Sequence, residues 1–234
     1  MFDKPIIVAC DVSSVSDLKR LINSISNDHC RTKIGKELFT NIGPQAIDIC
    51  HKAGFDVFLD LKFHDIPTTC AKAVKAAARM GVWMTNVHCA GGLEMMHEAR
   101  EVLDGESHKP ILLGVTVLTS MDQEGLNKIG VSKALSSHVD ELSSLAKDAG
   151  LDGVVCAATE VQRLSNALGQ DFCLVTPGIR PAWATKNDQK LVGTPREATN
   201  NGAHYLVIGR PITKADCPQT AIDRIMNELQ TNNG

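Results

Sequence analysis

The 234-residue sequence lacks the features that would place it in a membrane, on nucleic acid or outside the cell. No apolar stretch approaches the ~18 residues that a membrane helix needs, and no basic segment followed by an apolar one resembles a signal peptide. The net charge of -3 produces no field that would attract nucleic acid or an anionic membrane. These absences predict a cytoplasmic protein whose partners include neither nucleic acid nor a membrane.

Signatures of metals and of common nucleotide cofactors are also missing. The eight cysteines include no C-x-x-C pair, and several lie inside apolar runs, so we expect reduced, mostly buried thiols and no zinc site. No G-x-G-x-x-G follows the first predicted strand, and no G-x-x-x-x-G-K-[ST] occurs. The missing glycine-rich turn disfavours an open, doubly wound dinucleotide-binding sheet.

Eight apolar or β-branched runs alternate with helical patterns along the chain. The runs span residues 5–11, 30–35, 56–62, 82–88, 110–119, 152–157, 172–178 and 204–209. Helical spacing of apolar residues is clearest over residues 16–25 and 136–150. Eight strand–helix units in a chain of this length predict an α/β fold, the eightfold (β/α) TIM barrel, as a single domain over residues 1–234. An open doubly wound sheet is the alternative.

The third run, DVFLDLK, ends in two charges that packing does not explain. Side chains of a strand alternate with period two, so Asp60 and Lys62 share one face. A parallel strand buried on both faces should be apolar throughout. Asp65 follows just before Pro67, which is expected to open a helix. The motif D-x-K-x-x-D is therefore a candidate reactive group, with a simple ion pair at a strand end as the alternative.

In a barrel, the C-terminal ends of all strands meet at one mouth, where active sites lie. The sequence places the following residues there: Asp11, Lys33, Asp60 with Lys62, His88, Thr119, Gly178 with Arg180, and Gly209 with Arg210. Two long polar connections, residues 120–133 and 179–194, leave the same face. The segments TPGIRP and IGRP predict a phosphate site after strands seven and eight.

Four of these charges are expected to lie in contact with alternating sign. They are Lys33, Asp60, Lys62 and Asp65. Two carboxylates ~4 Å apart repel by about 4 kcal/mol at an effective dielectric constant of ~20, so interleaved lysines are needed to keep both ionised. Such an array can hold an ammonium proton ready for a carbanion that develops on a substrate.

Eight segments, taken together, resemble the orotidine 5′-monophosphate decarboxylase family of the bacterial type. They are IIVACD, KIG, FLDLKFHDIPTT, NVH, VTVLTSM, GLDGVVC, LVTPGIRP and YLVIGRP, and they cover nearly the whole chain. The resemblance implies an eightfold barrel that forms a homodimer. It also implies conversion of orotidine 5′-monophosphate to uridine 5′-monophosphate and carbon dioxide, the last step of de novo pyrimidine nucleotide synthesis, without a metal or an organic cofactor.

The resemblance implies roles for individual residues. Lys62 would donate a proton to C6 of the pyrimidine, Asp60 would lie against the substrate carboxylate, and Lys33 would order the charges. Asp65 and Thr69 would reach into the site of the partner subunit. The other substrate contacts would be Asp11 and Lys33 at the ribose, Thr119 at the base, and Arg180, Gln189, Gly209 and Arg210 at the 5′-phosphate, with Gln189 also bridging to the base.

Two other interpretations stay open at this stage. A keto-sugar-phosphate decarboxylase or a hexulose-phosphate synthase has the same D-x-K-x-x-D motif on a barrel but uses a magnesium ion. A barrel that binds a phosphorylated ligand without turnover would be a sensor. The intact Lys62 argues against the sensor, and metal dependence distinguishes the enzymes.

Overall fold

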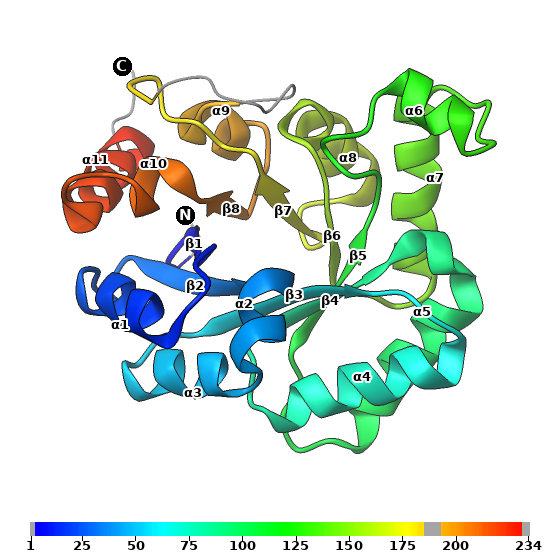
Figure 1. The fold of residues 1–234 in the computed structure, drawn as a ribbon. Coiled ribbons are helices and arrows are strands. Elements are labelled where there is room, and N and C mark those ends of the chain that lie inside the picture. Colours follow the sequence, from blue (N-terminus) through cyan, green and yellow to red (C-terminus); the bar gives the residue numbers. More distant parts are fainter. Residues whose placement is uncertain (1–2, 185–192, 231–234) are drawn as a thin grey trace.

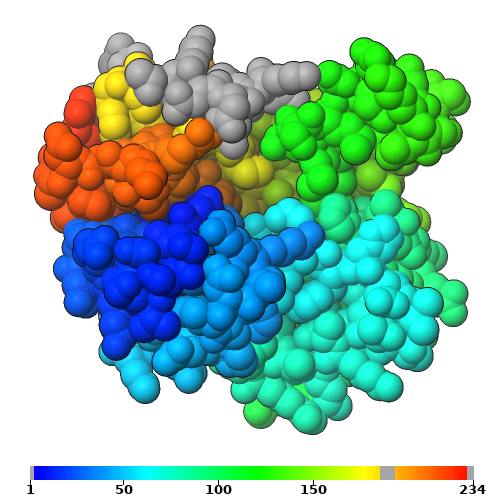
Figure 2. All heavy atoms as spheres, viewed as in Figure 1, coloured from blue at the N-terminus to red at the C-terminus, as the bar shows by residue number. Residues whose placement is uncertain are grey.

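The structure is a computed structural model that describes residues 3–184 and 193–230. Its strands are parallel, and each pairs with the next along the chain from β1 to β8. The sheet closes because β8 pairs with β1, with Val8 opposite Ile208. Helices surround the barrel (Figure 1), and the N-terminal segment lies against the C-terminal helices in the space-filling view (Figure 2). The predicted eightfold (β/α) barrel is confirmed.

The strands follow the eight apolar runs of the sequence. They are β1 (Ile6–Ala9), β2 (Cys30–Gly35), β3 (Val57–Phe63), β4 (Met84–His88), β5 (Ile111–Val115), β6 (Gly153–Val155), β7 (Cys173–Pro177) and β8 (Tyr205–Ile208). The helices are α1 (Val15–Asn23), α2 (Lys36–Ile42), α3 (Gln45–Lys52), α4 (Pro67–Arg79), α5 (Gly92–Glu101), α6 (Gln123–Lys128), α7 (Leu135–Asp148), α8 (Val161–Leu168), α9 (Pro195–Asn200), α10 (Arg210–Thr213) and α11 (Pro218–Gln230), with short 3-10 helices η1 (Cys89–Gly91), η2 (Val102–Gly105) and η3 (Ala158–Glu160). Within residues 3–184 and 193–230, no helix has the length and apolar character needed to cross a bilayer.

Helix boundaries follow local capping chemistry. α1 begins after Ser14, whose side chain accepts a hydrogen bond at 3.1 Å from a backbone N–H of the first turn. α4 begins at Pro67, as predicted. The N–H at the first position of a helix has no acceptor within the helix, so proline, which lacks an N–H, is favoured there. The connection of residues 120–133, expected as a polar loop, contains α6. The Asp122 side chain caps that helix by accepting a hydrogen bond from the Gly125 N–H at 3.0 Å.

Alternation along the strands creates two apolar layers. In β3, Phe58 points into the barrel, whereas Val57 and Leu59 face the surrounding helices. The packed interior consists of Ile7, Ala9, Phe58, Met84, Leu113, Val175 and Val207. Asp60 and Asn86 continue the inward-facing positions of β3 and β4, so both lie above this interior, toward the C-terminal mouth.

The N-terminal end of the barrel is closed by Arg31, near the start of β2. Its guanidinium carbon lies 4.3 Å from the ring centroid of Trp83, and its Nε donates to Asp56 Oδ2 at 3.1 Å. The Arg31 Nη1 donates to the carbonyl oxygens of Asp3 and Lys4, at 2.6 and 2.7 Å. Arg31 therefore ties the segment before β1 to the ends of β2, β3 and β4.

Candidate active site

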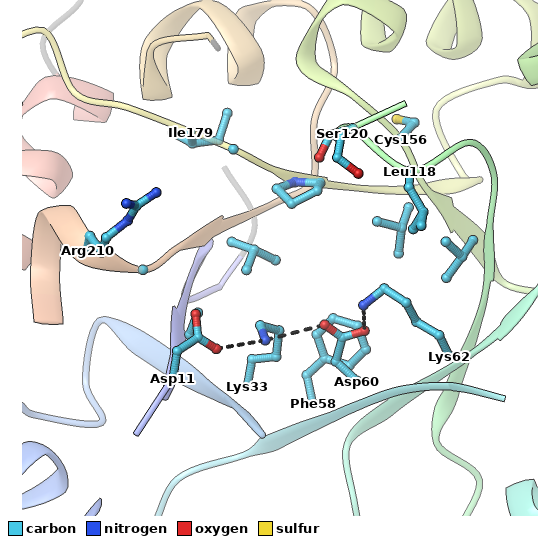
Figure 3. A pocket seen from close by; sticks show the side chains of 18 of the residues that line it. Asp11, Lys33, Phe58, Asp60, Lys62, Leu118, Ser120, Cys156, Ile179 and Arg210 are labelled. Atoms are coloured by element: carbon cyan, nitrogen blue, oxygen red, sulfur yellow. Dashed lines mark hydrogen bonds and ion pairs between the residues drawn. The ribbon is translucent and has the colours of Figure 1, made fainter. Parts of the chain in front are cut away.

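A pocket of about 310 Å³ opens at the C-terminal mouth of the barrel (Figure 3). One side is charged and consists of Asp11, Lys33, Asp60 and Lys62, which we call the charge row. The apolar side includes Val115, Val117, Leu118, Val155, Ile179 and Val207, and the polar lining also includes Thr119, Ser120, Arg180 and Arg210. An apolar pocket with a few convergent polar groups is typical of a small-molecule site.

The charge row is continuous from the end of β1 to the end of β3. Lys33 Nζ lies 3.5 Å from Asp11 Oδ1 and 3.3 Å from Asp60 Oδ2. Lys62 Nζ lies 2.5 Å from the other oxygen of Asp60, Oδ1. Figure 3 shows these contacts as one line across the floor of the pocket. The Asp60 carboxylate is thus held between two ammonium groups.

The charge row keeps its buried members ionised. Burial alone would raise the pKa of Asp60, but Lys33 and Lys62, with hydrogen bonds from Lys62 and Asn86, hold that pKa below its ordinary value. Burial alone would lower the pKa of Lys33, but Asp60 and Asp11 raise it above its ordinary value. At neutral pH the pocket therefore contains a carboxylate and an ammonium group with little access to water.

The backbone of Lys62 is unusual. Among the described residues, Lys4 and Lys62 are the only residues other than glycine with a positive φ. The φ of Lys62 is 51°, in the left-handed region that side chains disfavour. Between the pairs Leu59–Thr85 and Phe63–Val87, β3 has three residues where β4 has one, so β3 bulges at Lys62. This bulge brings Lys62 Nζ back toward Asp60, in the preceding inward-facing position of β3.

Asn86 on β4 is a polar residue of the site that the sequence analysis did not single out. Its side chain is fully buried, accepts a hydrogen bond from the Lys62 N–H at 2.8 Å, and donates to Asp60 Oδ1 at 2.7 Å. Its position in the predicted fourth strand was the feature of the sequence that could have identified it. An amide at an inward-facing position of a buried strand needs polar partners inside the barrel.

Asp65 lies outside the charge row of its own chain. Its Oδ1 accepts a hydrogen bond from the Ile66 N–H at 2.7 Å, and its side chain and that of Thr69 are exposed. Among the described residues, no ion pair joins Asp65 to a lysine. The expectation that four charges ending in Asp65 meet within one chain is therefore not met, because the turn into α4 directs this segment away. Asp11 occupies the outer end of the row.

The residues expected at a phosphate and described by the structure also line the pocket. Arg180, Gly209 and Arg210 all line it, and Figure 3 shows Arg210 on the side opposite Lys62. The Arg180 N–H donates to the carbonyl of Gly193 at 3.0 Å, which joins the two ends of the connection after β7. Gln189 lies outside the described residues.

Thr119 lines the pocket from a position different from the one expected. It belongs to the connection after β5, which ends at Val115, and not to the strand itself.

His88, at the end of β4, is half-buried, and its ring centroid lies 5.4 Å from that of His64. Burial, with the nearby His64, Lys36 and Lys62, lowers the pKa of His88 to about 4, so its imidazole is neutral at pH 7. Across residues 3–184 and 193–230, no three His, Cys, Asp or Glu side chains are placed to hold a metal ion.

Comparison with known proteins identifies relatives over nearly the whole chain. A family model described as "Orotidine 5′-phosphate decarboxylase / HUMPS family" matches residues 4–225. A protein from Vibrio cholerae serotype O1, named orotidine 5′-phosphate decarboxylase, is 51% identical over 230 residues, covering 98% of this chain and 100% of that protein. A protein of the same name from Teredinibacter turnerae is 52% identical over 225 residues, covering 96% and 97%. The crystal structure of orotidine 5′-phosphate decarboxylase from Lactobacillus acidophilus is 37% identical with a TM-score of 0.87, covering 98% and 100%.

Proposed function

Because the chain belongs to the orotidine 5′-phosphate decarboxylase / HUMPS family, we propose that it converts orotidine 5′-monophosphate to uridine 5′-monophosphate and carbon dioxide. The observation that carries the proposal is the Asp60 carboxylate, held ionised between Lys33 and Lys62 in a pocket that Arg180 and Arg210 also line. The reaction needs a cation at a developing carbanion and an anchor for a phosphate, and Lys62 and the two arginines are the groups that we assign to these roles.

The substrate would span the pocket from one charged end to the other. Its 5′-phosphate binds Arg180, Gly209 and Arg210, and its ribose hydroxyls meet Asp11 and Lys33, whose ion pair lies between the two ends. The pyrimidine then lies near Lys62 and the apolar lining, with Thr119 at the base. Binding energy from the distant phosphate positions the ring for reaction.

Lys62 is the proton donor of this mechanism. The bond from C6 to the carboxylate breaks and leaves its electron pair on C6, where charge is poorly delocalised. A preorganised ammonium group favours this charge in the transition state more than in the bound substrate. The Lys62 Nζ then transfers its proton to C6 and recovers one from solvent. No metal or organic cofactor takes part in these steps.

Asp60 contributes electrostatically to the same step. It lies against Lys62, so a substrate carboxylate on C6 would come close to the Asp60 carboxylate. Two carboxylates ~4 Å apart repel by about 4 kcal/mol at an effective dielectric constant of ~20. Departure of neutral carbon dioxide relieves this repulsion. Asp60 also fixes the position of the Lys62 ammonium group, while Lys33 keeps Asp60 ionised.

The functional unit is proposed to be a homodimer in which Asp65 and Thr69 reach the partner's pocket. Both are exposed, and two apolar side chains, Ile66 just before α4 and Leu93 in the first turn of α5, are 65% and 47% exposed. A contiguous second pocket of about 290 Å³ lies beside the charge row, and its charged lining consists of Lys33, Lys36 and Lys62 with Asp11, Glu37 and Asp60. A carboxylate from a partner subunit would meet these cations there.

The test is to incubate the purified, chelator-treated protein with orotidine 5′-monophosphate and to measure the release of carbon dioxide. We expect turnover that is independent of added metal. Turnover that requires magnesium would favour the sugar-phosphate branch that shares the family name. Nucleotide binding without turnover would favour a sensor and overturns the proposal, whereas turnover that requires magnesium overturns its metal-independent mechanism. The names of the relatives at about half identity favour the decarboxylase.

A further inference from the structure

Asn86 joins the two residues on which the proposed chemistry depends. Its Oδ1 accepts a hydrogen bond from the backbone N–H of Lys62 at 2.8 Å, and its Nδ2 donates to Asp60 Oδ1 at 2.7 Å. We propose that Asn86 is a positioning residue, which holds the Lys62 backbone in its left-handed conformation and stops the Asp60 carboxylate from rotating. This inference rests on the proposed decarboxylation for its kinetic consequences, but its structural consequences stand apart from it.

The position of Asn86 explains why the bulge in β3 persists. Three residues of β3, including Lys62, lie opposite Asn86 alone, so the regular ladder of backbone hydrogen bonds is interrupted there. The Asn86 side chain supplies the acceptor for the Lys62 N–H that the ladder does not. Asn86 itself is held rigidly, because it is fully buried and its own backbone is paired with Leu113 of β5.

The carboxamide of Asn86 satisfies both neighbours at once. The Lys62 N–H is a donor, and the ionised Asp60 carboxylate can only accept. The two contacts therefore fix the orientation of the Asn86 amide, with oxygen toward Lys62 and nitrogen toward Asp60. An aspartate has the same shape but no donor, and a leucine has neither group.

Asn86 also completes the set of donors around the Asp60 carboxylate. Lys33 lies at Oδ2, whereas both Lys62 and Asn86 donate to Oδ1. A carboxylate held by donors at both oxygens cannot turn without breaking a contact. The Lys62 backbone N–H is hydrogen-bonded to the same Asn86 side chain. A shift of Asn86 would therefore move the proton donor, Lys62, and its counter-ion, Asp60, together.

Thr85 provides a matched control on the same strand. It is also fully buried, and its Oγ1 donates to the Leu59 carbonyl of β3 at 3.0 Å. It faces the opposite side of the sheet, because neighbouring residues of a strand alternate. Thr85→Val thus removes a buried side-chain hydrogen bond between β4 and β3 without touching Lys62 or Asp60.

The kinetic experiment compares Asn86→Ala, Asn86→Asp and Thr85→Val. We expect Asn86→Ala to lower kcat by about 100-fold, because a displacement of ~1 Å in a reacting group has an effect of this size. The dissociation constant of uridine 5′-monophosphate should change less than about 3-fold, since the phosphate contacts are intact. Thr85→Val should keep kcat within about 3-fold at a similar loss of stability. A normal kcat in a folded Asn86→Ala protein overturns the inference.

Asn86→Asp is the second variant and separates the two contacts. It keeps the acceptor for the Lys62 N–H and the side-chain volume, but places a carboxylate against Asp60, with Lys33 and Lys62 the nearest cations. We expect a lower kcat at pH 7 that partly recovers as the pH falls, because a protonated carboxyl can again donate to Asp60. A pH profile parallel to that of the wild type would contradict the role of the Asp60 contact.

Crystal structures of the wild type and Asn86→Ala give a result that does not depend on the reaction. We expect the positive φ at Lys62 in the wild type, and a Lys62 Nζ displaced by more than ~1 Å in the variant. An unchanged Lys62 and Asp60 in the variant overturns the positioning role even if the protein decarboxylates its substrate. Displacement in a protein that lacks decarboxylase activity would instead leave this role standing and remove the proposed function.

Discussion

Lys62 Nζ and Asp60 Oδ1 lie 2.5 Å apart at the C-terminal end of one strand, with the lysine side chain 24% exposed and the aspartate side chain 11% exposed. Both residues lie on β3, which bulges between Leu59 and Phe63, and the backbone at Lys62 is left-handed. The ammonium group therefore has a fixed counter-ion and a fixed position before any substrate binds. Preorganisation of this kind is what a reaction through a carbanion requires.

Replacement of the lysine tests its proposed role directly. We expect Lys62→Ala to lower kcat by at least about 1,000-fold, because it removes the cation that stabilises the transition state and the proton that completes the product. Loss of substrate absorbance gives the rate, and circular dichroism checks the fold. Lys72→Ala, a change at an exposed position of α4, serves as the control. Near-normal turnover in Lys62→Ala would rule out the lysine as proton donor.

The phosphate assignment predicts a loss of binding that depends on the phosphate itself. We expect Arg210→Ala to weaken binding of uridine 5′-monophosphate by about 10- to 100-fold, the range for one charged hydrogen-bonding group. Binding of uridine, which lacks the phosphate, should not change. Titration calorimetry with both ligands measures the two dissociation constants. An equal loss for uridine would show that Arg210 acts on the pocket and not on the phosphate.

Shared sites predict complementation between two inactive variants. In a mixed dimer of Lys62→Ala and Asp65→Ala subunits, one pocket receives Lys62 from one chain and Asp65 from the other, and is intact. Random exchange of equal amounts should restore about a quarter of wild-type activity, because half of the dimers are mixed and each has one intact pocket. Mass spectrometry confirms the exchange. Mixed dimers without activity would contradict the shared site.

The barrel itself could be predicted from the sequence because its evidence is local. Each apolar run and each helical period lies within a short window, and alternation placed Asp60 and Lys62 on one face of their strand. The meeting of Lys33 with Asp60 then followed from the common mouth of the strands. These inferences do not depend on the register of one strand against the next.

Features that depend on pairing between strands could not be predicted in this way. The bulge at Lys62 is set by the register of β3 against β4, and Asn86 has its role only because it lies opposite that bulge. Sequence distance suggested that Asp65 would join its own charge row, but the direction of the turn before α4 decides this. The place of Thr119 depends similarly on where β5 ends.

His88 predicts a loss of stability on mild acidification. Its pKa is lowered to about 4 from an ordinary 6.5, first by burial and then by His64, Lys36 and Lys62, although Asp60 opposes the shift. The unfolded chain binds this proton more readily, so the contribution is complete above pH 6.5 and is lost as the pH falls toward 4. Solvent screening of the half-buried ring should leave ~1 kcal/mol of this effect at pH 5.

The check is urea unfolding of the wild type and His88→Gln at pH 7 and pH 5. Glutamine keeps hydrogen-bonding groups but does not titrate. We expect the wild type to lose ~1 kcal/mol more than the variant between the two pH values. The lowered pKa of Asp60 affects stability in a lower pH window, below the ordinary value of 3.8, so it does not interfere. Equal losses in both proteins would argue that His88 titrates normally.

Arg31 should matter for stability and not for catalysis, because it closes the end of the barrel remote from the pocket. Arg31→Lys keeps the charge but loses the planar fork that reaches Asp56 and the backbone of Asp3, and the stacking on Trp83. We expect the free energy of unfolding to fall by ~1 to 2 kcal/mol, with kcat unchanged in the folded protein. Arg20→Lys, whose side chain is 78% exposed, is the matched control and should change stability by less than ~0.5 kcal/mol. Urea unfolding gives both values, and equal effects of the two substitutions would mean that the contacts of Arg31 add little beyond its charge.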